Sequence, residues 1–171
     1  VKGNNKLSVG NPVVLEWNNK SGLLFRKKIE LDDKFLFRIT QEIQNKSNSK
    51  IELYPYAQIT RNQKPVLQAG SMSGTLILHD GFIGVFDEEL KEDDYDDIED
   101  RKKEYIADDG WLGITDKYWL TALVPEKNKS FKGEFLFKNG FKANYIENQP
   151  VTVQPSSSKS SETKIFIAAK E

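Results

Sequence analysis

The stretch Phe35-Leu36-Phe37-Arg38-Ile39-Thr40-Gln41-Glu42-Ile43 alternates between apolar side chains and more polar ones. Its residues divide between two faces, with Phe35, Phe37, Ile39 and Ile43 on one and Arg38, Thr40 and Glu42 on the other. Successive side chains of a strand point to opposite faces, so this alternation predicts a β-strand with one face in a core. The same two-residue period recurs along most of the chain and indicates an all-β fold.

Further strands are expected on both sides of this stretch. The apolar runs that predict them span residues 13–17, 23–31, 51–60, 73–78, 82–86, 131–137, 141–146, 151–154 and 164–168. Pro55 interrupts the run 51–60, which predicts a sheet edge or a bulge because proline cannot donate to the ladder. Lys138-Asn139-Gly140 separates two of the runs and predicts a hairpin, since Asn and Gly tolerate positive φ.

Residues 111–124 form a long apolar and aromatic run, which predicts either one long central strand or two strands with a bend. The best helical candidate, residues 90–105, is too acidic and too poor in apolar spacing for a good amphipathic helix. The Ser-rich residues 155–161 are expected to form a mobile loop within the domain. Many short strands separated by turns favour a sandwich or a barrel.

The composition sets limits on the class of protein. The 171 residues are enough for one domain, and a net charge of −1 predicts no general attraction to nucleic acid or to an anionic membrane. The lack of cysteine excludes a disulfide framework, a zinc–thiolate site and a thiol nucleophile. No apolar run approaches the roughly 18–20 residues needed to span a bilayer, so we expect a soluble chain. It begins with Val1 and its one methionine is Met72, so we expect a piece of a longer protein.

His79 is the one histidine of the chain. As a general base or metal ligand it would need a carboxylate or further ligands nearby. The adjacent Asp80 does not supply this, because neighbours along a strand point to opposite faces. We therefore predict a histidine in a turn or at a strand end.

The segment from Asp87 to Asp109 holds 13 of the 26 acidic residues. A calcium loop would need alternating aspartates, a glycine and a distal glutamate, and this spacing is missing. Paired carboxylates for glycoside hydrolysis would need a rigid scaffold. We predict a solvated, partly flexible loop, with weak binding of divalent ions left open.

Trp111, Tyr118 and Trp119 form an aromatic cluster. Exposed, such rings could stack on sugars, whereas buried rings would belong to the core. The even spacing of Trp111 and Trp119 would place both on one face of a regular strand. We predict that the cluster is core.

The run Gly110-Trp111-Leu112-Gly113-Ile114-Thr115-Asp116-Lys117-Tyr118-Trp119-Leu120-Thr121-Ala122-Leu123-Val124-Pro125 resembles a long, specific block of YidC-type membrane protein insertases. Residues 82–87 with Leu90, residues 149–155, and residues 35–45 also resemble segments of that family, in the same order. Two turns depart from its pattern: Glu88-Glu89 replaces Gly-Lys, and Ser156 replaces a glycine. The resemblance runs from about Leu23 to the C-terminus.

The resemblance implies that residues 1–171 are a fragment of one large periplasmic domain, with first strands before Val1 and a connecting helix after Glu171. The implied fold is a β-supersandwich similar to galactose mutarotase and to carbohydrate-binding domains. The implied parent is a multi-pass inner-membrane insertase that acts with or without the Sec translocon. Its implied partners are Sec accessory subunits and nascent membrane proteins, while no catalytic residue, cofactor, metal or nucleic acid is implied.

Two alternatives to a non-catalytic interaction domain remain open. A carbohydrate-binding module or mutarotase-like protein would share the fold, although mutarotase chemistry needs an acid and a base that a single histidine does not supply. A free periplasmic chaperone or binding protein is disfavoured by the order of the two family segments at 110–125 and 149–155.

Overall fold

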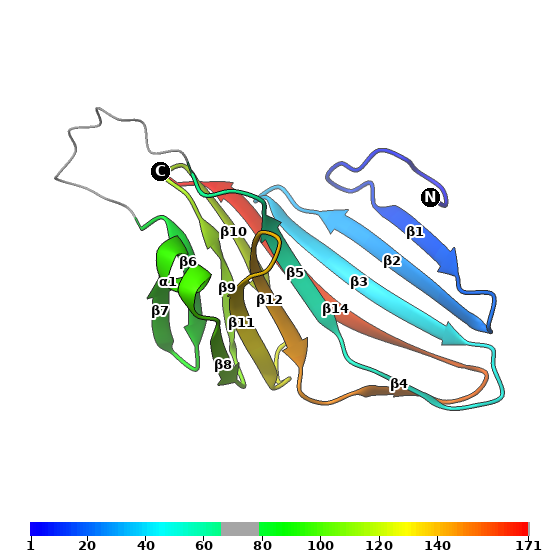
Figure 1. The fold of residues 1–171 in the computed structure, drawn as a ribbon. Helices are drawn as coiled ribbons and strands as arrows, with labels where there is room; N and C mark the ends of the chain where they lie inside the picture. Colours follow the sequence, from blue (N-terminus) through cyan, green and yellow to red (C-terminus); the bar gives the residue numbers. More distant parts are fainter. Residues whose placement is uncertain (66–78, 171) are drawn as a thin grey trace, which may run out of the picture.

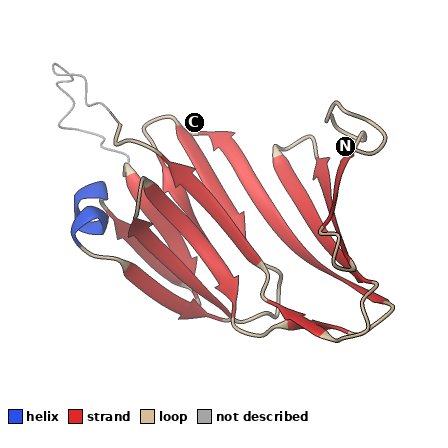
Figure 2. Ribbon diagram, turned by 45° about the vertical axis from the view of Figure 1, so that its right-hand side comes forward, coloured by secondary structure: helices blue, strands red, loops and turns tan. Residues whose placement is uncertain are grey.

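The computed structural model describes residues 1–65 and 79–170, which form antiparallel strands and one short helix (Figures 1 and 2). The elements are β1 (Val13–Asn18), β2 (Leu23–Leu31), β3 (Leu36–Asn45), β4 (Ile51–Leu53), β5 (Tyr56–Arg61), β6 (Gly81–Phe86), β7 (Glu89–Asp93), α1 (Tyr95–Asp100), β8 (Lys103–Ala107), β9 (Gly110–Thr115), β10 (Trp119–Val124), β11 (Phe131–Phe137), β12 (Phe141–Glu147), β13 (Val151–Val153) and β14 (Ser157–Ala169). The all-β prediction is confirmed.

Two sheets stack to form the sandwich. The larger has the strand order β1-β2-β3-β14-β10-β9-β6-β7, and the smaller has the order β5-β12-β11-β8. A separate two-stranded pair joins β13 to β4 at the lower end of the molecule in Figure 1. The smaller sheet covers only the half of the larger one that contains β6, β9 and β10, so β1, β2 and β3 extend beyond it (Figure 1).

The core lies where the two sheets overlap. Phe82 and Leu112 from the larger sheet and Phe135 and Tyr145 from the smaller one are completely buried. The ring centroids of Phe82 and Phe135 are 5.0 Å apart, a distance typical of packed aromatic pairs. Burial of this apolar surface is the main force that holds the sheets together.

Several predictions for individual strands are confirmed. Pro55 separates β4 from β5, and β5 lies at the edge of the smaller sheet. The hairpin between β11 and β12 turns at Asn139 and Gly140, which have φ values of 53° and 119°. Residues 111–124 form two strands, β9 and β10, which pair with each other. The expected strand at 73–78 lies outside the described residues.

Two local predictions are wrong. The Ser-rich loop predicted at 155–161 is limited to a turn at its start, and from Ser157 the chain forms the 13-residue β14, because Ser157 to Phe166 pair with β3. The strand expected at 164–168 is confirmed as the end of that longer strand. Phe35, which was predicted on the core face of the strand at 35–43, precedes β3 and is exposed. It lies in a turn with a φ of 61°, and the conformation of this turn directs the chain there in spite of the apolar side chain.

The acidic segment from Asp87 to Asp109 is ordered as β7, α1 and β8, so the prediction of a flexible loop is wrong. Its few apolar residues explain this outcome. Tyr95 and Ile98 of α1 are buried in the core, and Tyr105 of β8 stacks on Phe86 with ring centroids 4.6 Å apart. The carboxylates take the solvent-facing positions between these anchors, except that of Asp93, which is buried and accepts a hydrogen bond from the Tyr105 hydroxyl.

The two turns that depart from the resembled family keep left-handed backbones. Asp87 and Glu88 form the β6–β7 turn with φ values of 50° and 72°, and Ser156 has φ 56° before β14. Two residues of positive φ fit the right-handed twist of a hairpin, so the chain keeps the turn without the glycine.

Replacing Glu147 by glutamine should stabilise the protein at neutral pH by about 1 kcal/mol, the order of the penalty for an unsatisfied buried polar group. Glu147 is 2% exposed, its Oε1 has no hydrogen-bond partner among the described residues, and burial raises the pKa of its carboxyl. Because the pKa of this carboxyl is higher in the folded state than in the unfolded state, its protonated form adds stability when the pH is below the unfolded-state pKa. That stability is lost as the pH rises through the folded-state pKa. Urea unfolding across that pH range measures the difference.

The stability gained by Glu147→Gln should therefore shrink toward acid pH, where Glu147 is protonated in both the folded and the unfolded wild-type protein. Glu92→Gln, at an exposed position of β7, is the matched control and should change stability little at any pH. A loss of stability in Glu147→Gln at neutral pH would contradict the prediction.

Candidate functional site

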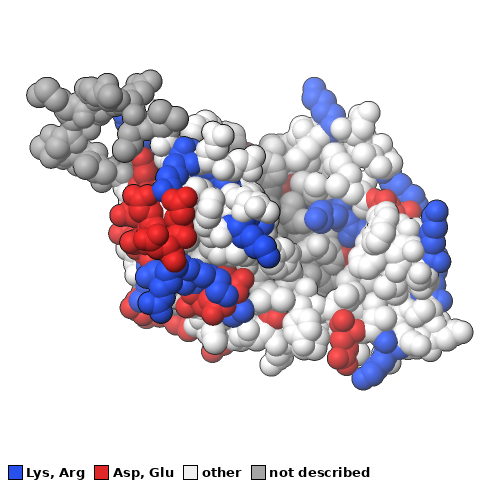
Figure 3. All heavy atoms as spheres, viewed as in Figure 1, with Lys and Arg blue, Asp and Glu red and all other residues white. Residues whose placement is uncertain are grey.

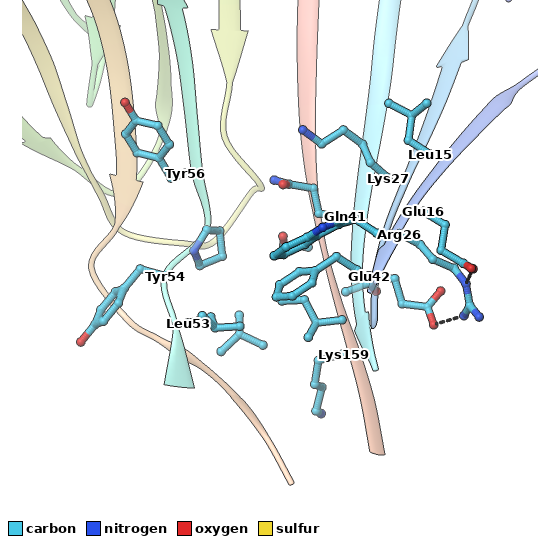
Figure 4. A pocket seen from close by; sticks show the side chains of 17 residues that line it. Leu15, Glu16, Arg26, Lys27, Gln41, Glu42, Leu53, Tyr54, Tyr56 and Lys159 are labelled. Carbon is cyan, nitrogen blue, oxygen red and sulfur yellow. Dashed lines mark hydrogen bonds and ion pairs between the residues drawn. The ribbon is translucent and has the colours of Figure 1, made fainter. Parts of the chain in front are cut away.

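A cleft of about 500 Å³ opens between the uncovered half of the larger sheet and the segment that joins β4 to β5. Figure 3 shows the hollow from outside, and Figure 4 shows the side chains that line it. One wall consists of residues from β1, β2, β3 and β14. The other wall is the short stretch from Leu53 to Tyr56, with Val151 of β13 opposite Leu53.

The strand register builds the first wall in rows. Trp17 of β1 lies opposite Phe25 of β2, which lies opposite Ile43 of β3. The rings of Trp17 and Phe25 are in contact, with centroids 5.3 Å apart. Residues directly opposite each other point to the same face, so the row forms a continuous apolar strip.

The next row along the same strands is mixed in character. Leu15 lies opposite Lys27, Lys27 opposite Gln41, and Gln41 opposite Ser161. Apart from Leu15, these side chains offer hydrogen-bonding groups beside the apolar strip. The wall can therefore bind apolar side chains and polar backbone groups at adjacent positions.

The opposite wall ends in a free strand edge. Tyr54 and Tyr56 are both about half exposed, and Pro55 breaks the chain between β4 and β5. On one side β5 pairs with β12, and on its other side it pairs with no strand of residues 1–65 or 79–170. Such an edge presents unpaired backbone N–H and C=O groups to an incoming chain.

A second hollow of about 390 Å³ continues the cleft along β5. The two share Lys27, Gln41 and Tyr56, and the second is lined further by Ile39 and Ile165 of the larger sheet. Together they form a groove that runs from β4 along β5.

The charged side chains near the cleft form two groups: an ion-pair network on the side away from the opposite wall, and lysines that line the cleft. Arg26 binds Glu16 and Glu42 at 2.9 and 3.1 Å, and Figure 4 shows this network at the side away from the opposite wall. Hydrogen bonds from Lys2 and then Arg26 lower the pKa of Glu16. Lys27 and Lys159, which line the cleft, have no carboxylate partner among the described residues.

His79 lies outside the cleft, and the prediction of a strand-end position is confirmed. It comes just before β6, and its Nε2 lies 2.8 Å from the carbonyl oxygen of Phe82. Its Nδ1 lies 3.6 Å from Oδ1 of Asp94, at the exposed start of α1. Within the described part of the chain, no group of three His, Cys, Asp or Glu side chains could hold a metal ion.

The prediction that Trp111, Tyr118 and Trp119 form part of the core is wrong for the last two. Tyr118 and Trp119 are more than half exposed, and Trp111 is only partly buried. The turn at 116–118 reverses the chain, so the spacing rule for a single strand does not apply. Leu112 pairs with Leu123, which places Trp119 on the face of Leu112 and Trp111 on the opposite face.

Sequence reasoning did not single out the cleft residues. Trp17, Phe25 and Ile43 each lie in a predicted strand, but the period of a strand does not say which strand lies beside it. The break at Pro55 was the one local signal of this site.

The one helix of the described residues, α1, is short and lacks the length and apolar character to cross a membrane.

Solved structures with a similar fold include the galactosidase domain of the alpha-galactosidase-sucrose kinase AgaSK, with a TM-score of 0.62 and 7% identity. That match covers 92% of this chain and 24% of the other. A galactose mutarotase related enzyme from Lactobacillus acidophilus matches with a TM-score of 0.59 and 10% identity, over 94% of this chain and 67% of the other. These likenesses confirm the predicted mutarotase-like β-fold.

Sequence comparison gives the family. The membrane protein insertase YidC of Pelagibacter ubique is 47% identical over 170 residues, and that of Bradyrhizobium diazoefficiens is 37% identical over 175 residues. Both matches cover 99% of this chain, which spans 30% and 27% of those proteins, so the similarity extends beyond the expected start near Leu23. The profile of the YidC periplasmic domain matches residues 1–171. The chain therefore belongs to the family of YidC periplasmic domains.

Proposed function

We propose that this chain is a non-catalytic interaction domain on the periplasmic side of an inner-membrane insertase. We further propose that its cleft holds extended segments of membrane proteins during their insertion. The observation that carries the proposal is the apolar strip of Trp17, Phe25 and Ile43 facing the free edge of β5. Family membership supplies the context.

An extended polypeptide has two requirements that this groove matches. Its backbone needs hydrogen-bond partners, which an unpaired strand edge offers, and its alternate side chains need apolar contacts. The two hollows, of about 500 and 390 Å³, have room for a short extended segment and not for a folded domain. Binding of this kind is sequence-tolerant, as a domain that serves many substrates requires.

The partners follow from this mode of binding. Nascent membrane proteins are the proposed occupants of the groove, and accessory subunits of the Sec translocon are proposed to contact the outer surface. The likeness to galactosidases and mutarotases supports the architecture alone, because unrelated functions share one fold.

Site-specific crosslinking in the membrane-embedded insertase tests the proposal. A photoreactive amino acid at Ile43, in the apolar strip, should form adducts with a stalled nascent membrane protein. The same probe at Ile106, which is exposed on β8 away from the groove, is the matched control and should form far fewer. Equal labelling from both positions, or none from Ile43 while insertion proceeds, would contradict the proposed role of the cleft.

A further inference from the structure

Large exposed aromatic side chains gather at one end of the larger sheet, apart from the cleft. Phe35 lies in the turn before β3, and Tyr118 and Trp119 lie at the turn between β9 and β10. We call these three residues the aromatic rim. None of them lines the cleft or its continuation along β5.

Backbone hydrogen bonds from the end of β14 place the two turns at the same end of the larger sheet. The backbone N–H of Ile167 donates to the carbonyl of Phe35 at 3.4 Å, and that of Lys170 donates to the carbonyl of Tyr118 at 2.9 Å. Since β14 lies between β3 and β10, the rim follows one edge of the molecule, the upper edge in Figure 1 near the C-terminus.

Lysines alternate with the rim aromatics. Lys34 precedes Phe35, Lys117 lies with its Nζ 5.1 Å from the ring centroid of Tyr118, and Lys170 follows β14. None of the three has a carboxylate partner among the described residues. Two of the three carboxylates in these turns are engaged: Arg61 binds that of Asp116, and that of Asp32 accepts the backbone N–H groups of Lys34 and Leu36. The third, Asp33, is exposed beside Lys34 and offsets one of the lysine charges.

This combination fits the surface of a lipid bilayer. Tryptophan and tyrosine prefer the membrane–water interface, where the ring lies among apolar groups and the polar atom stays hydrated. Lysines beside them are attracted to anionic headgroups. The net charge of −1 gives the whole chain no such attraction, so the contact would depend on the local rim.

We propose that the aromatic rim is the membrane-facing surface of this domain and contacts a bilayer that contains anionic phospholipid. The proposal goes beyond the role of the cleft and uses different residues. The relatives are named membrane protein insertases, so a bilayer is a surface within reach of such a domain. A weak contact suffices, because attachment to a membrane protein raises its effective concentration there.

Tryptophan fluorescence with vesicles tests the proposal. A variant with Trp17→Phe and Trp111→Phe leaves Trp119 as the one reporter, and a variant with Trp111→Phe and Trp119→Phe leaves Trp17. Both reporters start similarly exposed, at 56% and 63%, but only Trp119 lies on the rim. With millimolar phosphatidylglycerol-containing vesicles, Trp119 emission should shift to the blue and be quenched by brominated lipid, while Trp17 stays unchanged.

Cosedimentation of the unsubstituted chain with the same vesicles provides a measurement that does not depend on the tryptophan variants. Lys117→Ala should lower its partition coefficient about fivefold, because one lysine near an anionic surface contributes on that order. Lys46→Ala, in the β3–β4 turn at the opposite end, should leave it unchanged. No Trp119 shift at millimolar lipid, or equal shifts at Trp17 and Trp119, would overturn the proposal.

Failure of this test would leave the crosslinking result from the cleft unaffected. Conversely, vesicle binding through the rim would stand even if no nascent chain were captured at Ile43.

Discussion

Replacing Phe82 by alanine should lower the free energy of unfolding by about 3–5 kcal/mol, the usual cost of removing a fully buried phenyl ring. Phe82 is completely buried where the two sheets and α1 meet. Its ring lies 5.0 Å from that of Phe135, 5.7 Å from that of Tyr95 and 6.2 Å from that of Phe141. Alanine would leave a cavity among side chains from three separate elements, α1, β11 and β12, which cannot all collapse into it.

Urea unfolding followed by tryptophan fluorescence measures this loss. Phe35→Ala is the matched control, since Phe35 is 64% exposed and its removal should change stability by less than about 0.5 kcal/mol. Native stabilities are only about 5–15 kcal/mol, so the Phe82→Ala protein would be barely stable. Phe82→Leu, which keeps most of the volume, should cost less than about 1.5 kcal/mol and keeps the comparison measurable. Equal effects at Phe82 and Phe35 would contradict the position of the core.

Replacing Gly113 by alanine should cost about 3 kcal/mol, at the upper end of the usual penalty for overpacking. Gly113 lies in β9 between β6 and β10, opposite Ile83 and Ala122. A Cβ atom there would lie 2.1 Å from the carbonyl oxygen of Thr121 and 2.9 Å from the Cα of Ala122. Both are backbone atoms of a central strand, so relief requires β9 and β10 to separate.

Gly3→Ala is the matched control for Gly113→Ala. A Cβ at Gly3 would meet no atom within 4 Å, although its φ of 75° makes alanine mildly strained. Its cost should stay near or below 1 kcal/mol, about the penalty for a left-handed alanine. The difference between the two variants in urea unfolding isolates the close approach of the strands. A Gly113→Ala protein as stable as Gly3→Ala would show that β9 and β10 are not packed as described.

Much of the sandwich follows from local patterns. The two-residue alternation in 36–45 and the hairpin at Asn139-Gly140 depend on interactions within a few residues, so they could be predicted directly. The prediction of a flexible loop at Asp87–Asp109 was wrong because it relied on the number of charged residues and not on the spacing of the few apolar ones. Two buried residues, Tyr95 and Ile98, are enough to attach a short helix when a core lies beside it.

Taken alone, the sequence determined that this protein is made of strands, where most of them begin and end, and which family it resembles. Only the tertiary structure decided that β14 pairs with β3, that Trp17, Phe25 and Ile43 align in one row, and that Trp119 lies on the surface. The reason is that a strand's period specifies two faces but neither its neighbour nor which face another layer covers. The groove along β5 exists because the smaller sheet covers only part of the larger one, whereas the aromatic rim is formed by two turns that β14 brings to the same end of the larger sheet.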